Sequence, residues 1–345
     1  MSKTVRADEA HLKRVAALAE EIVHSGEYAS AVLAVANLDG VVWRHVVPGE
    51  DDLGWDTVFW IASINKPIVA TALMQLVERG LVVLGEPVAQ HLPEFARHGK
   101  EALIVWHLLT KTCGYAWPPE SLFDELIQTR APLSAHLEVA YDLKLAHEPG
   151  AQASDTDLNY IVLAELIRRV TGKPYSEYLH EQLFTPLGMQ ETSFAPGPER
   201  RAPRHDIGPG ELPHFISLAL PFAGLFSTAD DLVALGRAFL NNGKLGAVRV
   251  LSQAAITTMT QPVMLKDARG DVTRPTYAGL GWGLRGPHAN VLGSPRAYGH
   301  AGASGSWLWI DPEWELVFVL LSNTAHGKPT IPMRLLNAVY GALER

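Results

Sequence analysis

Apolar residues recur with two different periods along this chain, and the two periods separate strand-rich ends from a helix-rich middle. Near the N-terminus, helical spacing relates Leu12, Val15, Leu18, Ala19, Ile22 and Val23. Two β-branched runs follow, Ala31–Asn37 and Val41–Val47, with Leu38-Asp39-Gly40 between them. Because Asp-Gly supplies the positive φ of a tight turn, these runs predict a β-hairpin.

Two more apolar runs near the C-terminus, Gly305–Ile310 and Leu316–Leu321, predict a second hairpin through Asp311-Pro312-Glu313-Trp314. A short extended run at Thr57–Ile61 precedes the first helix of the middle region, which is expected to end at Gly80. Helical spacing covers Ser63–Arg79, Asn159–Val170, Pro174–Phe184, Thr228–Leu240 and Pro332–Leu343. The pattern therefore predicts strands from both ends of the chain and mainly helices between them.

These elements predict an α/β (α+β) protein with a mainly antiparallel sheet flanked by helices, beside an all-helical domain. Residues 1–62 and 226–345 are expected to form the sheet domain, and residues 63–225 a mainly helical insertion. A groove between two such domains is a natural ligand site, so we expect the active site there.

Composition narrows the possible partners and the location. The 345 residues are 47% hydrophobic and 19% charged, as is ordinary for a globular protein. The formal net charge of −8 disfavours nucleic acid or an anionic membrane as the main partner. Cys113 is the single cysteine, which excludes an internal disulfide and a multi-cysteine metal site. The first residues lack a signal-peptide pattern and no apolar run is long enough to span a membrane, which favours a soluble, cytoplasmic protein.

One short motif carries candidate chemistry. Ser63-Ile64-Asn65-Lys66 places a serine and a lysine three positions apart at the start of a predicted helix, on one helix face. The lysine amine can then reach the serine hydroxyl, and the helix N-terminus offers N–H groups to an oxyanion. The alternative is a structural cap followed by a surface lysine. The sequence contains no P-loop, H-E-x-x-H or G-x-S-x-G motif, and it predicts no metal and no cofactor.

Longer matches surround this motif in the same order as in a known family. They are Trp60–Pro67, Leu76–Gly80, Val88–Phe95, Trp106–Thr110, Glu148–Gly150, Pro186–Met189, Gly224–Asp231 and Gly299–Gly305. With these segments the chain resembles the serine β-lactamase/penicillin-binding-protein family, most closely its class C-like esterases and D-aminopeptidases. The resemblance implies a β-lactamase/transpeptidase-like fold from about residue 10 to the C-terminus.

By the family's pattern, the resemblance implies that Ser63 attacks an acyl carbonyl and carries the acyl-enzyme, while Lys66 helps to deprotonate it. The main-chain N–H groups of Ser63 and Ala303 are implied as the oxyanion hole. His300-Ala301-Gly302 stands where β-lactamases often have K-T-G and many esterase relatives have H-x-G. This position implies a catalytic role for His300, with Gly302 and Ala303 against the substrate, because a side chain at Gly302 would block the groove.

The middle motif departs from the family. Relatives usually carry P-G-x-x-x-x-Y-S-[ND], where this chain reads Pro149-Gly150-Ala151-Gln152-Ala153-Ser154-Asp155-Thr156-Asp157. Asp155 then occupies the position of the catalytic tyrosine, and Asp157 that of the substrate-binding Asn/Asp. A reading slipped by two residues puts Ala153 at the tyrosine instead, so the tyrosine is missing either way. Tyr141 and Tyr160 are the nearby candidates to replace it, with packing as the alternative, and Asp155 is either a substitute base or a vestige.

The sequence therefore favours a serine hydrolase that cleaves a small ester or amide through a Ser63 acyl-enzyme. Because H-x-G replaces K-T-G, a carboxylesterase is favoured over an efficient β-lactamase. Two alternatives stay open: an acyltransferase of secondary metabolism that uses the same acyl-enzyme, and a catalytically idle binding protein that kept the groove. A small ester or amide is the expected partner, without nucleic acid or membrane, and the oligomeric state is left open.

Overall fold

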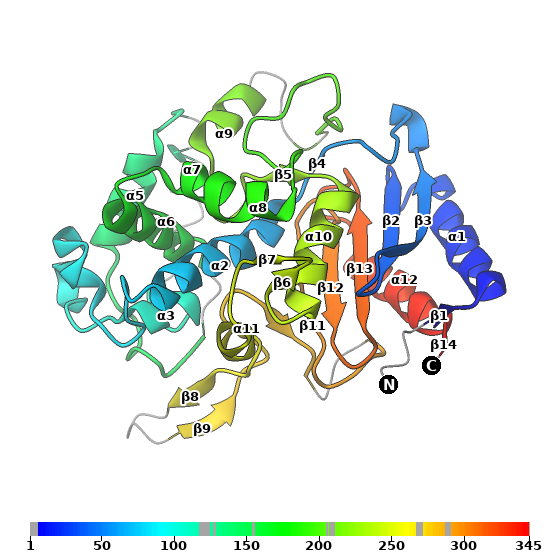
Figure 1. Cartoon of the computed structure of the whole chain (residues 1–345). Coiled ribbons are helices and arrows are strands. Elements are labelled where there is room, and N and C mark those ends of the chain that lie inside the picture. The colour runs from blue at the N-terminus through cyan, green and yellow to red at the C-terminus, as the bar shows by residue number, and fades with distance from the viewer. Residues whose placement is uncertain are drawn as a thin grey trace.

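A six-stranded antiparallel sheet brings the two ends of the chain together (Figure 1). The computed structural model describes residues 6–116, 125–126, 129–153, 156–204, 206, 211–266, 272–286 and 291–344. In order across the sheet the strands are β10 (Gly283–Leu284), β11 (Tyr298–Ala301), β12 (Trp307–Asp311), β13 (Leu316–Leu321), β2 (Ala31–Ala36) and β3 (Val41–Val47). Within it, β13 pairs with β2, which comes from the opposite end of the sequence.

Both predicted hairpins are present, and each turn is held by one short polar side chain. Between β2 and β3, Oδ1 of Asn37 accepts hydrogen bonds from the N–H of Asp39 at 2.8 Å and of Gly40 at 3.1 Å. Between β12 and β13, the Asp311 carboxylate accepts a hydrogen bond from the N–H of Glu313 at 3.0 Å. Because such side chains stabilise the turn from within, the hairpins could be predicted from the sequence around each turn.

The strand β2, which lies next to the edge strand β3, is buried on both faces. Two helices, α1 (Glu9–His24) and α12 (Thr330–Tyr340), cover one face of the sheet. The helix α10 (Ala229–Leu240) covers the other face (Figure 1). Successive side chains of β2 enter opposite cores, so Leu33 packs on the side of α1 and α12, and Ala34 on the side of α10. Because both faces of this strand are covered, its residues form a continuous apolar run in the sequence.

The middle of the chain forms a group of helices beside the sheet (Figure 1). They are α2 (Asn65–Glu78), α3 (Val105–Leu109), α5 (Leu133–Asp142), α6 (Leu158–Thr171), α7 (Tyr175–Leu179), α8 (Thr185–Leu187) and α9 (Leu212–Leu218). The single helix predicted over Pro174–Phe184 is instead α7 followed by a π-helical turn, His180–Phe184. Pro186 stands just after this turn and cannot donate the main-chain hydrogen bond that a regular ladder would need, which accounts for the wider turn.

Short elements complete the fold. They are β1 (Arg6–Ala7) with β14 (Leu343–Glu344), β4 (Phe59–Trp60) with β5 (Phe226–Ser227), β6 (Lys244–Leu245) with β7 (Val248–Arg249), β8 (Met264–Lys266) with β9 (Val272–Pro275), and α11 (Gln253–Met259). The predicted class, a mainly antiparallel sheet flanked by helices with further helices beside it, is confirmed. The domain boundaries stay a prediction. Among the described residues, no helix is long and apolar enough to cross a membrane.

Candidate active site

Ser63 lies on a sharp turn between a short strand and a long helix. After β4, the N–H of Ile61 donates to the carbonyl of Leu225 at 3.0 Å, which continues the pairing with β5. The chain then enters a 3₁₀ turn, Ala62–Ile64, in which Ala62 has a φ of 47°. A non-glycine residue in this region is strained and persists only where its surroundings hold it, and such residues cluster at functional sites. Ser63 follows directly and is partly exposed.

Lys66 lies in the first turn of α2, three residues after Ser63, and is buried. Its Nζ lies 2.7 Å from Oδ1 of Asp157, whose side chain is 40% exposed. The ring centroid of Tyr160, a fully buried residue of α6, lies 5.8 Å from the same Nζ. The buried ammonium therefore has a counter-charge that solvent still reaches, on the residue just before α6.

One loop holds both sides of the Ser63 turn. The side-chain amide of Asn65, fully buried, donates to the carbonyl of Leu220 at 2.9 Å. On the other side of the turn, the indole N–H of Trp60 donates to the carbonyl of Ala223. Because these bonds tie β4 and α2 to the same loop, the strained turn at Ala62 is fixed from both directions.

The end of β11 approaches this turn because residue 302 is a glycine. A Cβ built on Gly302 would lie 2.4 Å from the carbonyl oxygen of Ile61 and 3.2 Å from the Cβ of Ala62. The N–H of Gly302 donates to Ser306 at 2.8 Å, and the carbonyl of the exposed Ala303 accepts from the N–H of His326 at 2.8 Å. The structure thus places Gly302 directly against the residues that precede Ser63.

His300 lies on β11, two residues before Gly302. Its Nδ1 is 2.8 Å from the carbonyl oxygen of Ala301. A carbonyl oxygen only accepts hydrogen bonds, so Nδ1 carries the proton in this contact. In neutral His300 the ring atom that can accept a proton is then Nε2.

The candidates in and near the middle motif have different outcomes. Asp155 lies outside the described residues, as does Ser154. Tyr141 is buried on α5 with its ring centroid 6.4 Å from that of Phe95, so it packs in the helical core. Tyr160 is also fully buried, as the packing interpretation predicted, although its ring adjoins Lys66.

The single cysteine and most of the tryptophans near the site are structural. Cys113 is buried, and burial raises the pKa of its thiol, which keeps it protonated. Trp282 and Trp309 are buried in the two cores, whereas Trp60 and Trp307 each line a cavity. No group of three or more His, Cys, Asp or Glu side chains among the described residues could hold a metal ion.

Arg204 is a neighbour of the site that no sequence pattern indicates. Its guanidinium carbon lies 3.4 Å from the ring centroid of Trp60 and 4.5 Å from that of Phe215. Arg204 belongs to a stretch with neither helical nor strand periodicity, so only the fold brings it to Trp60. An arginine between prolines and aromatic residues in a sequence does not by itself indicate a functional residue.

Comparison with known proteins places this site in a family. Residues 15–341 match the family described as Beta-lactamase, and the chain therefore belongs to that family. Membership agrees with the antiparallel sheet, the helices beside it and the S-x-x-K motif at the start of α2. The protein is accordingly a serine hydrolase of the β-lactamase family, and the recognised resemblance is confirmed.

Individual relatives fall in several branches of the family. A putative D-alanyl-D-alanine carboxypeptidase of Escherichia coli is 27% identical over 323 residues, covering 81% of this chain and 71% of the relative. The structure of EstCE1, titled a hydrolase with promiscuous acyltransferase activity, matches with a TM-score of 0.83 at 21% identity, covering 97% and 99% of the two chains. A family VIII carboxylesterase matches with a TM-score of 0.77 at 20% identity, covering 98% and 99%. These likenesses confirm the β-lactamase/transpeptidase-like fold.

Proposed function

We propose that this protein cleaves a small ester or amide through an acyl-enzyme on Ser63, with the preference of a carboxylesterase rather than of an efficient β-lactamase. One observation carries the proposal: Gly302 lies against Ile61 and Ala62, so the end of β11 adjoins the turn that presents Ser63. The nucleophile, the buried Lys66 and the strand end with Ala303 are therefore assembled at one place.

The first half of the reaction forms the acyl-enzyme. Oγ of Ser63 attacks the acyl carbonyl carbon, and its proton passes to a base. The main-chain N–H groups of Ser63 and Ala303 are proposed to stabilise the tetrahedral oxyanion. The bond to the leaving alcohol or amine then breaks, and the leaving group takes up the proton. The second half repeats these steps with water as the nucleophile, which releases the acid and restores Ser63.

The proton needs an acceptor, because an ammonium has no free electron pair. We assign a relay in which Nζ of Lys66 takes the Ser63 proton while Lys66 gives one of its own to Asp157. The 2.7 Å separation between Nζ and Oδ1 supports this transfer. Asp155 is the second candidate acceptor, by its position in the sequence.

In this proposal, the presence of His300 where β-lactamases often have a lysine favours ester substrates. A lysine at that point in the strand keeps a fixed positive charge, which suits anionic substrates such as β-lactam acids. A neutral imidazole offers no such charge, and with its proton on Nδ1 it can accept a proton on Nε2. We therefore assign His300 to passing the Ser63 proton on: Nε2 accepts it from the Lys66–Asp157 pair and gives it to the leaving group.

Covalent labelling tests the proposed nucleophile. A fluorophosphonate probe should label the wild type at Ser63, identified by peptide mass, and p-nitrophenyl acetate should be hydrolysed. Ser63→Ala should lose both, with little change in Tm, because the partly exposed hydroxyl is not part of the core. Ser217→Ala is a matched control, since that hydroxyl bonds only within α9. Labelling at another residue, or none in a folded wild type, would contradict the proposal and favour the idle binding protein.

Two aspartate variants separate the candidate proton acceptors. If Asp157 completes the relay, Asp157→Asn should lower kcat by about 10²-fold or more, the usual scale of general-base catalysis. If Asp155 is the base, Asp155→Asn should show that loss instead. If Asp155 is a vestige, Asp155→Asn should be neutral and Asp155→Tyr should raise activity. Equal kcat in the wild type and all three variants would place the base elsewhere.

Acyl transfer is the second candidate, because the structurally similar EstCE1 is a hydrolase with promiscuous acyltransferase activity. Both reactions use the same acyl-enzyme and differ only in what attacks it. Product analysis with added alcohols or amines distinguishes them: a hydrolase yields mainly the acid, whereas a transferase yields mainly the new ester or amide.

A further inference from the structure

The guanidinium of Arg204 is enclosed beside the candidate active site. Its side chain is 5% exposed, and the rings of Trp60 and Phe215 lie nearly perpendicular, at 87°, with centroids 5.8 Å apart. Contact with two aromatic rings desolvates a guanidinium and fixes its orientation. Arg204 is therefore a rigid group rather than a mobile surface side chain.

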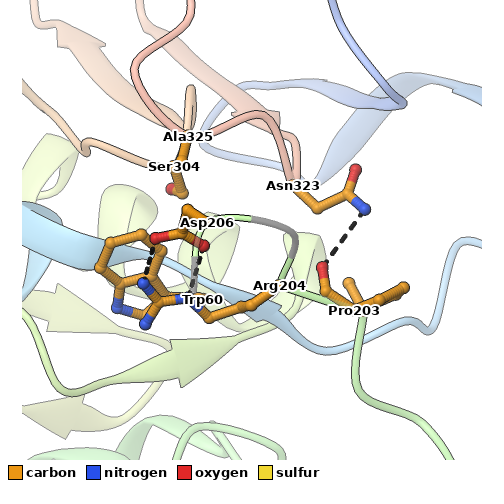
Figure 2. Close-up of a pocket in the computed structure, with 8 residues that line it drawn as sticks. Trp60, Pro203, Arg204, Asp206, Ser304, Asn323 and Ala325 are labelled. Atoms are coloured by element: carbon orange, nitrogen blue, oxygen red, sulfur yellow. Dashed lines mark hydrogen bonds and ion pairs between the residues drawn. The ribbon is translucent and has the colours of Figure 1, made fainter. Parts of the chain in front are cut away.

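Two of the three nitrogens of the Arg204 guanidinium donate hydrogen bonds, and the third does not. Nε donates to Oδ1 of Asp206 at 3.0 Å, and Nη2 donates to Oδ2 of the same carboxylate (Figure 2). Nη1 is buried and has no hydrogen-bond partner, a statement that covers the part of the chain described by the structure. An unsatisfied buried donor is costly, so such a group needs an explanation.

A small cavity is lined in part by Arg204 and its partner Asp206 (Figure 2). Its volume is about 10 Å³, and its lining includes Trp60, Arg204, Asp206, Ser304 and Asn323. That volume is close to the least that holds one water molecule, so it suits one oxygen atom. Asn323 already donates to Asp51 at 2.8 Å, and Ser304 donates to Ser306 at 3.0 Å.

The cavity lies next to the reacting residues. Trp60 precedes Ser63 by three positions, and Ser304 directly follows Ala303 at the end of β11. Gly302 holds these two segments in contact, since its missing side chain lets it meet the carbonyl of Ile61. The cavity wall formed by Trp60 and Ser304 therefore belongs to the two segments that meet beside the Ser63 turn.

The positive charge of the Arg204 guanidinium is already balanced by the carboxylate of Asp206. Although burial acts to raise it, the hydrogen bond and positive charge of Arg204 hold the pKa of Asp206 below its ordinary value. Asp206 is thus a carboxylate, and it neutralises the guanidinium that it binds. A second anion there would lack a counter-charge, whereas a neutral carbonyl oxygen needs only the two N–H groups of Nη1.

We propose that Arg204 is a specificity-determining residue whose Nη1 binds a neutral carbonyl oxygen of the substrate, away from the bond that is cleaved. The preferred substrates are then keto-acyl esters or amides, in which a second carbonyl follows the scissile one along the acyl chain. This inference rests on the proposed function, since it assigns a subsite to the acyl-enzyme reaction at Ser63.

Matched p-nitrophenyl esters measure this preference directly. The 4-oxopentanoate and 5-oxohexanoate esters are compared with the pentanoate and hexanoate esters of the same chain length. We expect kcat/KM for at least one keto ester to exceed that of its alkyl partner by about tenfold or more, as a hydrogen bond from a charged donor gives. A ratio of two substrates on one preparation does not depend on the fraction of enzyme that is folded.

Three variants assign the preference to this group. Arg204→Met should bring the keto-to-alkyl ratio to within about twofold of one. Arg200→Met, which removes a 38% exposed guanidinium paired with Glu191, should leave the ratio unchanged. Asp206→Asn leaves the guanidinium charge unbalanced, so it should raise kcat/KM for mono-p-nitrophenyl succinate relative to the 4-oxopentanoate by about tenfold.

The outcomes for the subsite and for the proposed function are distinct. If the alkyl esters are hydrolysed in a Ser63-dependent way but both keto ratios of the wild type lie near one, the subsite is wrong and the hydrolase stands. A keto preference that survives in Arg204→Met overturns the assignment to Arg204. If no ester is hydrolysed and Ser63 is not labelled, the proposed function itself fails.

Discussion

Lys66 and Lys100 are the two buried lysines in the part of the chain that the structure describes, and their surroundings differ. Lys66 faces the carboxylate of Asp157, which is 40% exposed. Lys100 is fully buried, and its Nζ donates to the main-chain oxygens of Tyr141 at 2.7 Å and Leu143 at 2.6 Å. These carbonyls lie at the C-terminal end of α5, where a cation is favourable. One lysine can exchange a proton with its partner, and the other cannot.

Burial alone therefore does not identify the reactive lysine. Burial lowers the pKa of Lys100 to about 8, a change often taken as a sign of a functional site. Yet Lys100 has no nucleophile one helical turn away, and both of its partners are carbonyls. The comparison teaches that the partner's chemistry, not the depth of burial, separates a candidate base from a structural anchor.

The largest expected difference is in catalysis. Lys66→Met should lower kcat/KM on p-nitrophenyl esters by about 10²–10⁴-fold, the range of general acid–base catalysis. Lys100→Met should leave kcat/KM of the folded enzyme within about twofold, since Lys100 serves α5 rather than Ser63. Steady-state kinetics with active-site titration by the fluorophosphonate probe provide the measurement. Equal losses in both variants would remove the distinction.

Arginine substitution separates charge from proton transfer. Lys66→Arg keeps a positive charge beside Asp157, but a guanidinium does not release its proton in proteins. We therefore expect a loss of kcat within about tenfold of that of Lys66→Met. Initial rates on p-nitrophenyl acetate measure it. If Lys66→Arg keeps near wild-type activity, Lys66 acts through its charge alone and the relay to Asp157 is wrong.

The loss of folding stability should be larger for Lys100→Met than for Lys66→Met, which is the reverse of the expected losses of activity. Lys100→Met leaves the carbonyls of Tyr141 and Leu143 without donors, which should lower the free energy of unfolding by about 1–3 kcal/mol. Lys66→Met should cost less than about 1 kcal/mol, because water can solvate the exposed part of Asp157. Urea unfolding followed by circular dichroism gives both values. A larger loss for Lys66→Met would mean that its ion pair is mainly structural.

The smallest effect is the pH dependence of stability. The pKa of Lys100 is about 8 in the folded protein, below the ordinary value of about 10.4 expected when unfolded. Between these values the unfolded chain binds more protons, so this residue makes stability rise with pH. The stability difference between the wild type and Lys100→Met should grow by about 1 kcal/mol from pH 7 to pH 9. Urea titrations at both pH values test this, and a difference that shrinks would reverse the sign.

Features set by neighbouring residues could be predicted from the sequence. Leu316–Leu321 was predicted as a strand with the bounds that β13 has, and the turns at Asn37 and Asp311 explain why. Ser63 and Lys66 share a helix turn, so their proximity follows from spacing alone. Gly302 was predicted to leave room for the substrate, which stays a prediction, and the structure shows that its missing side chain lets it approach the main chain of Ile61.

Contacts between distant segments could not be predicted in the same way. The sequence favoured Asp155 as the acidic residue near Lys66, and Asp155 lies outside the described residues. The ion pair between Lys66 and Asp157 was not predicted, because no periodicity records where the backbone before a helix points a side chain. Arg204 depends in the same way on a loop that meets Trp60 only in the folded protein.

The pairing of β13 with β2 also sets the order in which the protein can be completed on the ribosome. A hydrogen bond beside that pairing joins Ser30 to Asn323, 293 positions apart. At roughly 5–20 residues per second, β2 waits roughly 15–60 s for its partner strand to be synthesised. During that interval its apolar edge has no β13 to pair with and is open to wrong strands or to a chaperone. The helices of the middle region are made within the same interval, so the sheet that presents β11 to Ser63 closes only after they have been synthesised.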